Sequence, residues 1–138
     1  RKRLRRCILA ERILVADDEP DILNLTKLML EQEGYLVTTA SDGEETLRKA
    51  EAEMPDIILL DIVMPGKTGL EVCKILKAKR KTRDIPVVMF TALGQDVDRK
   101  LAKEVGCDGY FTKPFTLESL LTEVRRHLDR TRAERRSL

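Results

Sequence analysis

Five short apolar runs, separated by stretches with helical periodicity, constrain the fold of this chain more than any other feature of its sequence. The runs span Ile13 to Ala16, Tyr35 to Thr39, Ile57 to Leu60, Pro86 to Phe90 and Tyr110 to Thr112. The first, third and fourth are apolar throughout, which is typical of strands that are covered on both faces of a parallel sheet. The second and fifth are more mixed, as edge strands can be.

The segments between these runs are predicted to be helices. Their expected bounds are Pro20 to Glu33, Ser41 to about Glu53, Leu70 to Lys79, Gln95 to Val105, and a fifth helix that Thr116 caps. Apolar stripes at helical spacing are Ile22, Leu25, Leu28 and Met29 in the first, Val72, Ile75 and Leu76 in the third, and Leu117, Leu120, Leu121, Val124 and Leu128 in the fifth. Repeated βα units require a parallel sheet with right-handed crossovers and helices on both faces. The predicted fold class is therefore α/β, a doubly wound (βα)5 sheet.

The length and composition are those of one globular domain. The 138 residues are enough to close one core and too few for two. Hydrophobic residues make up 42% of the chain, and no apolar run approaches the roughly 20 residues that cross a bilayer. The basic start lacks the apolar core of a signal peptide. We therefore expect a cytoplasmic protein with no membrane partner.

Charge is distributed unevenly along the chain. Residues 1–7 carry five basic groups and no acid, whereas residues 8–124 hold 15 basic and 22 acidic residues. Phosphate backbones are bound by clustered Lys and Arg, so the acidic body argues against direct nucleic-acid binding by the domain. We interpret residues 1–9 as a basic N-terminal tail or linker and residues 131–138 as a charged C-terminal tail or linker. A weak contact of these ends with nucleic acid or an anionic membrane is the alternative.

Cysteine and histidine offer little material for catalysis or for a transition-metal site. Cys7, Cys73 and Cys107 form no C-x-x-C pair, and we expect them to be reduced thiols. His127 is the only histidine, which leaves almost nothing for a multi-histidine metal site or a Cys-His nucleophile. We expect His127 to lie on a solvated helix face.

Charged and hydroxyl side chains stand directly after four of the five predicted strands. The first strand is followed by Asp17, Asp18 and Glu19, the third by Asp61, the fourth by Thr91 and the fifth by Lys113. Ligand sites of doubly wound sheets lie at the carboxyl ends of the strands, so these residues are expected to meet. Carboxylates in one crevice repel one another unless a cation neutralises them, and oxygen ligands alone suit Mg²⁺ or Mn²⁺. A carboxylate beside Mg²⁺, a lysine and a hydroxyl can attack a phosphoryl group, and Asp61 has the central position.

Four segments of the chain resemble the receiver domains of response regulators, the two-component signalling family of which CheY is the single-domain type. They are Ile-Leu-Val-Ala-Asp-Asp-Glu-Pro at 13–20, Asp-Ile-Ile-Leu-Leu-Asp-Ile-Val-Met-Pro-Gly at 56–66, Phe-Thr-Ala at 90–92 and Tyr-Phe-Thr-Lys-Pro-Phe at 110–115. The resemblance covers about residues 10–130, which we take as the receiver domain. It implies a flavodoxin-like or CheY-like sheet with strand order 2-1-3-4-5, in a signalling switch that is not an enzyme in the ordinary sense.

The resemblance also implies a role for each site residue. Asp61 would accept a phosphoryl group from a sensor histidine kinase or a phosphotransfer protein. Asp18, Asp61 and the backbone carbonyl of Val63 would bind Mg²⁺ directly, and Asp17 would act mostly through water. Thr91 and Lys113 would contact the phosphoryl oxygens, Tyr110 would reorient on activation, and the Lys113–Pro114 bond is often cis in this family.

The implied readout is a population shift of the surface formed by the fourth helix, the fifth strand and the fifth helix. This surface would control a downstream protein or a covalently linked output domain. It is also where such domains form homodimers, but Gly109 stands where an acid is often found, so the dimer pattern is matched only in part.

Three alternatives share parts of this pattern. A phosphatase of the haloacid-dehalogenase type also uses an aspartyl nucleophile and Mg²⁺, but Val63 stands where its D-x-D motif requires a second acid. A flavodoxin-like FMN binder shares the sheet, but the acids after the first strand would repel the FMN phosphate. A degenerate receiver would be a phosphorylation-independent protein-binding module, and the intact set of acids, hydroxyl and lysine argues against it.

Two apolar side chains flank the expected phosphorylation site. Val63 lies two residues after Asp61, and Leu93 lies two residues after Thr91. Neither side chain can orient a hydrolytic water by hydrogen bonding, so we expect slow self-dephosphorylation. The alternative is that both residues simply pack at the bases of their loops.

Overall fold

The computed structural model of the chain describes residues 10–92 and 96–136. Its strands are β1 (Arg12–Ala16), β2 (Leu36–Ala40), β3 (Ile57–Asp61), β4 (Val87–Ala92) and β5 (Gly109–Lys113). Its helices are α2 (Pro20–Gln32), α3 (Gly43–Glu53), α4 (Gly69–Ala78), α5 (Asp96–Glu104) and α6 (Leu117–Arg136). Each predicted element is present, and the bounds differ from the predicted ones by a few residues at most where both ends were predicted.

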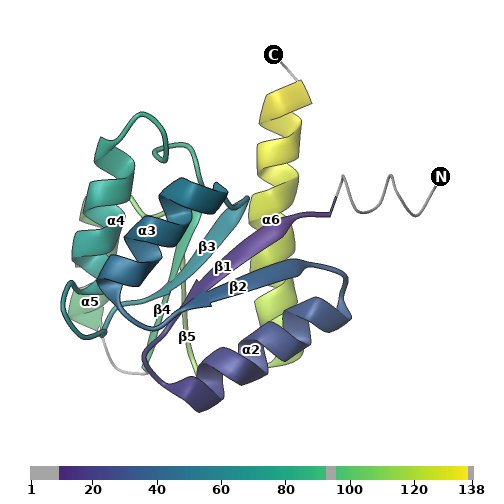
Figure 1. The fold of residues 1–138 in the computed structure, drawn as a ribbon, viewed down its shortest axis with the longest axis horizontal. Helices are drawn as coiled ribbons and strands as arrows, with labels where there is room; N and C mark the ends of the chain where they lie inside the picture. The colour runs from purple at the N-terminus through teal and green to yellow at the C-terminus, as the bar shows by residue number, and fades with distance from the viewer. Residues whose placement is uncertain (1–9, 93–95, 137–138) are drawn as a thin grey trace.

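The five strands form one parallel sheet in the order β2-β1-β3-β4-β5 (Figure 1). This confirms both the predicted fold class and the predicted strand order, and it places the two mixed runs at the edges. β3 is central, and all five of its residues are buried. Pro86, predicted as the first residue of the fourth strand, lies just outside β4, although its carbonyl still accepts a hydrogen bond of 2.9 Å from the Ile58 N–H.

Helices cover both faces of the sheet, as the doubly wound arrangement requires (Figure 1). One face packs against α3, α4 and α5 through alternate strand residues such as Leu14, Ile58 and Met89. The other face packs against α2 and α6 through residues such as Ile13 and Leu59. Because side chains alternate between the faces of a strand, the continuous apolar runs supply both cores at once.

The stripe predicted for α2 was wrong for two of its four residues, because Ile22 and Met29 are partly buried against the core but Leu25 and Leu28 are not. The residues that α2 buries are Leu23, Thr26 and Leu30, whereas Leu25 and Leu28 are 50% and 55% exposed. The apolar residues of this helix extend around more of its circumference than one sheet face can cover, so the packing against the sheet decides which line is buried. Apolar side chains therefore remain on the outer side of α2.

The stripes of α4 and α6 are closer to prediction. In α4, Val72 and Leu76 are buried as expected, but Cys73 takes the place predicted for Ile75, which is partly buried. In α6, the four later residues of the stripe are buried and the first, Leu117, is 38% exposed. Cys73 and Cys107 are free thiols, and burial raises the pKa of the Cys73 thiol to about 12. Cys7 lies outside the described residues.

The predicted solvated position of His127 was wrong. Its side chain is 2% exposed, because α6 presents it to the sheet between the buried residues Val124 and Leu128. Space for the ring exists because the facing residue of β5, Gly109, has no side chain.

The last helix continues into the segment that was predicted as a charged tail or linker. α6 has 20 residues and reaches Arg136, so residues 131–136 are helical. Figure 1 shows its final turns projecting past the edge of the sheet. Within the described parts of the chain, no helix combines the length and the apolar character needed to cross a membrane.

Candidate functional site

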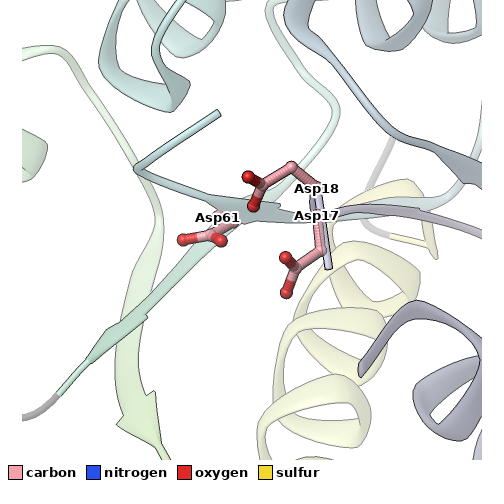
Figure 2. Close-up of side chains that lie close together, drawn as sticks. All are labelled: Asp17, Asp18 and Asp61. Atoms are coloured by element: carbon pink, nitrogen blue, oxygen red, sulfur yellow. The ribbon is translucent and has the colours of Figure 1, made fainter. Parts of the chain in front are cut away.

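Three carboxylates meet at the carboxyl ends of β1 and β3, as the sequence predicts. Asp17 and Asp18 follow β1, and Asp61 is the last residue of β3. One carboxylate oxygen of each lies within 4.8 Å of the others (Figure 2). Asp17 is fully buried and Asp61 is 4% exposed, whereas Asp18 is exposed. The cluster therefore opens to solvent on the Asp18 side.

Backbone hydrogen bonds fix the two buried acids. The Asp17 N–H donates to the Ala40 carbonyl at 3.1 Å, and one Asp17 carboxylate oxygen accepts from the Glu19 N–H at 3.0 Å. Asp61 Oδ1 accepts from the Val63 N–H at 3.3 Å. These bonds leave the second oxygen of each carboxylate directed at other groups of the site.

Lys113 supplies the positive charge of the site. It ends β5, and its Nζ donates to Asp17 Oδ2 at 2.7 Å and to Asp61 Oδ2 at 3.1 Å. Its side chain is 15% exposed and lies 3.6 Å from a Glu19 oxygen. The ammonium also stands 5.0 Å from the ring centroid of Phe90 on β4, the strand that separates β5 from β3. The lysine thus reaches across β4 to the acids, and its bond to the following Pro114 is cis.

The charges in the site do not balance, because among the described residues the three clustered acids and Glu19 outnumber the one lysine. Burial, followed by the negative charge of Asp17, raises the pKa of Asp61 from 3.8 to about 6, and Lys113 only partly opposes this rise. Burial alone would lower the pKa of Lys113, but its hydrogen bond to Asp17 and the charge of Asp61 outweigh that effect and raise it. The lysine therefore stays charged, whereas the ionised form of Asp61 is disfavoured by burial first and by the charge of Asp17 second.

Among the remaining predicted residues that the structure describes, Thr91 and Val63 lie at or close to the same edge. Thr91, predicted to follow the fourth strand, lies within β4 opposite Thr112 of β5, and its side chain is outside the described part of the structure. Val63 lies two residues after Asp61, in the loop that follows β3, and is 65% exposed. Tyr110 is the exception, because it lies near the start of β5, partly buried against the core of the α3, α4 and α5 face. Leu93 is outside the described residues.

A glycine and a helix cap that were not predicted as parts of the site hold the loop after β3. The Gly69 N–H donates to the Ile62 carbonyl at 2.8 Å, so the loop folds back onto the end of β3. A Cβ at Gly69 would stand 2.1 Å from the Asp61 carbonyl oxygen. Thr68 and Glu71 form a complete capping box at the start of α4. The T-x-x-E pattern at these positions is a signal that sequence reading can find.

The chemistry of this donor set fits a hard divalent cation. The ligand atoms on offer are carboxylate oxygens without nitrogen or sulfur, the set that suits Mg²⁺. Burial first and the negative charge of Asp17 second raise the pKa of Asp61, and a cation beside the carboxylate would offset both effects. A doubly wound sheet with an acid cluster and a lysine at its carboxyl edge defines a domain suited to Mg²⁺-assisted phosphorylation of a carboxylate.

Comparison with known proteins gives the family. The chain belongs to the response regulator receiver domain family, whose family model matches residues 13–125. It is 45% identical over 121 residues to the alkaline phosphatase synthesis transcriptional regulatory protein PhoP of Bacillus subtilis, an alignment that covers 88% of this chain and 50% of PhoP. The chain spans about half the length of the curated relatives it matches.

Solved structures agree with this assignment. The chemotaxis protein CheY4 of Vibrio cholerae superposes with a TM-score of 0.80 and 33% identity, covering 85% of this chain and 98% of CheY4. The receiver domain of the sensor histidine kinase PA1611 from Pseudomonas aeruginosa gives a TM-score of 0.81 at 29% identity, covering 87% and 98%. That PA1611 structure has a magnesium ion coordinated in its active-site cleft. This protein is thus a CheY-like receiver domain of the two-component type.

Proposed function

We propose that this domain is a phosphorylation switch in which Asp61 accepts a phosphoryl group with the help of Mg²⁺. The observation that carries the proposal is the meeting of Asp17, Asp18 and Asp61 with the ammonium of Lys113 at one sheet edge. Asp61 is the acceptor of choice because it ends the central strand, directs one oxygen toward Lys113 and has a carboxylate that burial and Asp17 destabilise. Transfer of a phosphoryl group to Asp61 forms an acyl phosphate and releases the leaving group of the donor.

The other residues of the site take the roles that the resemblance to receiver domains implies. Asp18, which is exposed, and Asp61 would hold Mg²⁺ directly, together with the backbone carbonyl of Val63. Asp17 is held by Lys113 and by the Glu19 N–H, and it would act on the cation through water. A bound Mg²⁺ would neutralise the acids, and Lys113 and Thr91 would contact the phosphoryl oxygens.

The switch has two kinds of partner, a phosphodonor and a downstream target. The donor is a sensor histidine kinase or a phosphotransfer protein of a two-component system. The readout surface consists of α5, β5 and α6, and the partly buried Tyr110 of β5 reorients within it on phosphorylation. Its target is a downstream protein or an output domain joined to the receiver, as the greater length of the relatives suggests. The same surface is the place for a homodimer.

The direct test is phosphorylation by acetyl phosphate followed by intact mass measurement. With Mg²⁺ the chain is expected to gain one phosphoryl group, as acetate leaves and the acyl phosphate of Asp61 forms. Asp61→Asn should gain none, and chelation of the metal by EDTA should prevent labelling of the natural chain. A matched control is Asp84→Asn, because Asp84 is an exposed acid outside the cluster and its loss should leave labelling unchanged.

Labelling of the Asp61→Asn variant, or an equal gain of mass with and without Mg²⁺, would refute the proposal. Labelling of neither the natural chain nor the Asp84→Asn control would refute it in the same way. That last result would identify the domain as a phosphorylation-independent binding module.

The lifetime of the phosphorylated state gives a second prediction. Val63 stands two residues after Asp61, and its apolar side chain is 65% exposed beside the site, where it cannot hold a water by hydrogen bonds. Val63→Asn adds an amide that can orient a water toward the phosphoryl group, so loss of phosphate should become roughly tenfold faster. The decay of the phosphorylated mass after removal of acetyl phosphate measures this rate. Val63→Leu is the control, and equal decay in the Asn and Leu variants would contradict the prediction.

A further inference from the structure

One buried polar residue plays no part in the site described above. His127 of α6 packs its imidazole against the first residue of β5, where a Cβ on Gly109 would stand 2.5 Å from Nε2 and 3.0 Å from Cε1. Lys113 of the acid site is at the other end of the same strand, roughly 13 Å away at about 3.3 Å per residue. His127 therefore lies outside the acid cluster, at the contact between α6 and the sheet.

The hydrogen-bond partners of the ring decide which nitrogen carries its proton. Nδ1 lies 3.4 Å from a guanidinium nitrogen of Arg130, and a guanidinium can only donate. Nδ1 is therefore the acceptor, and the proton of the neutral ring is on Nε2. Among the described residues Nε2 has no hydrogen-bond partner. The carboxylate oxygen Oε2 of Glu123 lies 3.5 Å from it.

The charged groups around the ring come from α6 and from the segment before β5. On α6 they are Glu123, Arg126 and Arg130, with Arg126 holding Glu123 Oε2 at 2.8 Å. Before β5 stands Asp108, whose Oδ1 is 3.7 Å from Arg130. Burial, then Arg126 and Arg130, lower the pKa of His127, and the two acids oppose this shift without overcoming it.

Among the described residues, the strand residues at this contact carry no charge. β5 contributes Gly109, and its neighbour in β4 is Val88. Asp108 is itself fixed, because its Oδ2 accepts from the Val87 N–H at 2.8 Å and from Lys77 Nζ at 2.7 Å. Arg130 is the arginine that is hydrogen-bonded to the ring, and its side chain is 52% exposed, so it has room to move into solvent.

We propose that His127 and Arg130 form an acid-sensitive clamp, in which Arg130 fixes the neutral imidazole within α6 and the imidazole packs against Gly109 of β5. A proton from solvent binds the lone pair of Nδ1 and displaces the Arg130 hydrogen bond. The imidazolium then repels Arg130 away from the ring, while the Nε2 proton, which the neutral ring already carries, stays 3.5 Å from Glu123 Oε2. Because a charge is now buried against the backbone of β5, the contact between α6 and Gly109 loosens.

The clamp requires no phosphoryl group, so it stands or falls independently of the proposed function. It concerns the β5 and α6 part of the readout surface, which acid would loosen whether or not Asp61 is modified. The direction of the stability change follows from the pKa of His127, which is lower in the folded chain than in the unfolded chain. The neutral ring therefore stabilises the fold above about pH 6.5, and this contribution is lost as the pH falls below that value.

Nuclear magnetic resonance of the imidazole tests the clamp, because the chain has a single histidine. The titration is best followed in the Asp61→Asn background, since Asp61 itself titrates at about pH 6. We expect a midpoint below about 6.5, a proton on Nε2 in the neutral form, and a Gly109 amide shift with the same midpoint. Arg130→Met should raise the midpoint by roughly half a unit or more, and Glu123→Gln should lower it.

The control is Arg125→Met, because Arg125 pairs with Glu33 on another side of α6 and does not contact the ring. It should leave the midpoint unchanged. Equal midpoints in the natural chain and in Arg130→Met, or a Gly109 amide that does not follow the imidazole, would overturn the proposal. A second measurement is urea denaturation between pH 5 and 7.5, in which His127→Leu should lose less stability on acidification than the parent chain.

Discussion

Asp61→Asn is expected to make the metal-free domain more stable at pH 7 by roughly 1–2 kcal/mol. The pKa of Asp61 is raised from 3.8 to about 6, so the fold disfavours its ionised form. At about 1.4 kcal/mol per pKa unit this amounts to roughly 3 kcal/mol at most. Solvent screening and the loss of a partner for Lys113 reduce that figure to the expected range.

The pH dependence of this gain has a definite sign. Between about pH 4 and pH 6 the folded chain binds a proton at Asp61 that the unfolded chain has already lost, so this residue lowers the stability of the natural domain as the pH rises. Asn does not titrate, so the advantage of the variant should grow over this interval and stay constant above it. Urea denaturation in EDTA at several pH values measures it.

Two further measurements separate the acid cluster from a general surface effect. Asp84→Asn removes an exposed acid and should change the stability by less than about 0.5 kcal/mol. Mg²⁺ should stabilise the natural domain more than the Asp61→Asn variant, because the cation relieves the same repulsion that the substitution removes. A variant less stable than the natural domain at pH 7 in EDTA would contradict this reading of the cluster.

Gly69→Ala is expected to destabilise the domain by about 3 kcal/mol. The new Cβ would stand 2.1 Å from the Asp61 carbonyl oxygen and 2.8 Å from the Ile62 Cα, which are backbone atoms that cannot turn aside. The end of β3 or the start of α4 must shift, and either movement displaces the carboxylate of Asp61. Helix propensity alone would make the alanine variant more stable by up to about 1 kcal/mol. A loss of stability would therefore show that the steric contact outweighs helix propensity.

Gly66→Ala is the matched control in the same loop. Gly66 has a φ of +73°, and nothing stands within 4 Å of its added Cβ. Alanine there should cost only the strain of a left-handed conformation, about 1 kcal/mol. Chemical denaturation of both variants gives the comparison, and a Gly69→Ala variant no less stable than Gly66→Ala would show that the loop yields without strain.

The sequence was sufficient for the sheet and for the meeting of the acids. The sheet could be predicted from apolar runs of strand length, which are visible in the sequence. The meeting of the acids followed from the rule that parallel strands end at the same edge of a sheet. Asp17, Asp61 and Lys113 could be brought together without a structure because each one follows or ends a strand. The separation of edge strands from central strands followed from composition for the same reason.

The wrong predictions concern contacts that depend on a second element. The outward direction of Leu25 and Leu28 follows from how α2 lies on the sheet, which periodicity within α2 cannot decide. The burial of His127 depends on the missing side chain of Gly109, 18 residues away in sequence. The requirement for glycine at position 69 was equally hidden, because it arises from the backbone of β3 and not from a local turn.

The 20 residues of α6 also give the domain a lever. The first part of the helix is packed on the sheet through Leu120, Val124 and Leu128, while the turns after Leu128 project beyond it. At 1.5 Å per residue the eight residues from 129 to 136 add about 12 Å of helix, so a tilt of roughly 10° about Leu128 carries the last turn sideways by about 2 Å. A small rotation at Leu128 therefore moves Arg136 while the residues packed on the sheet keep their places.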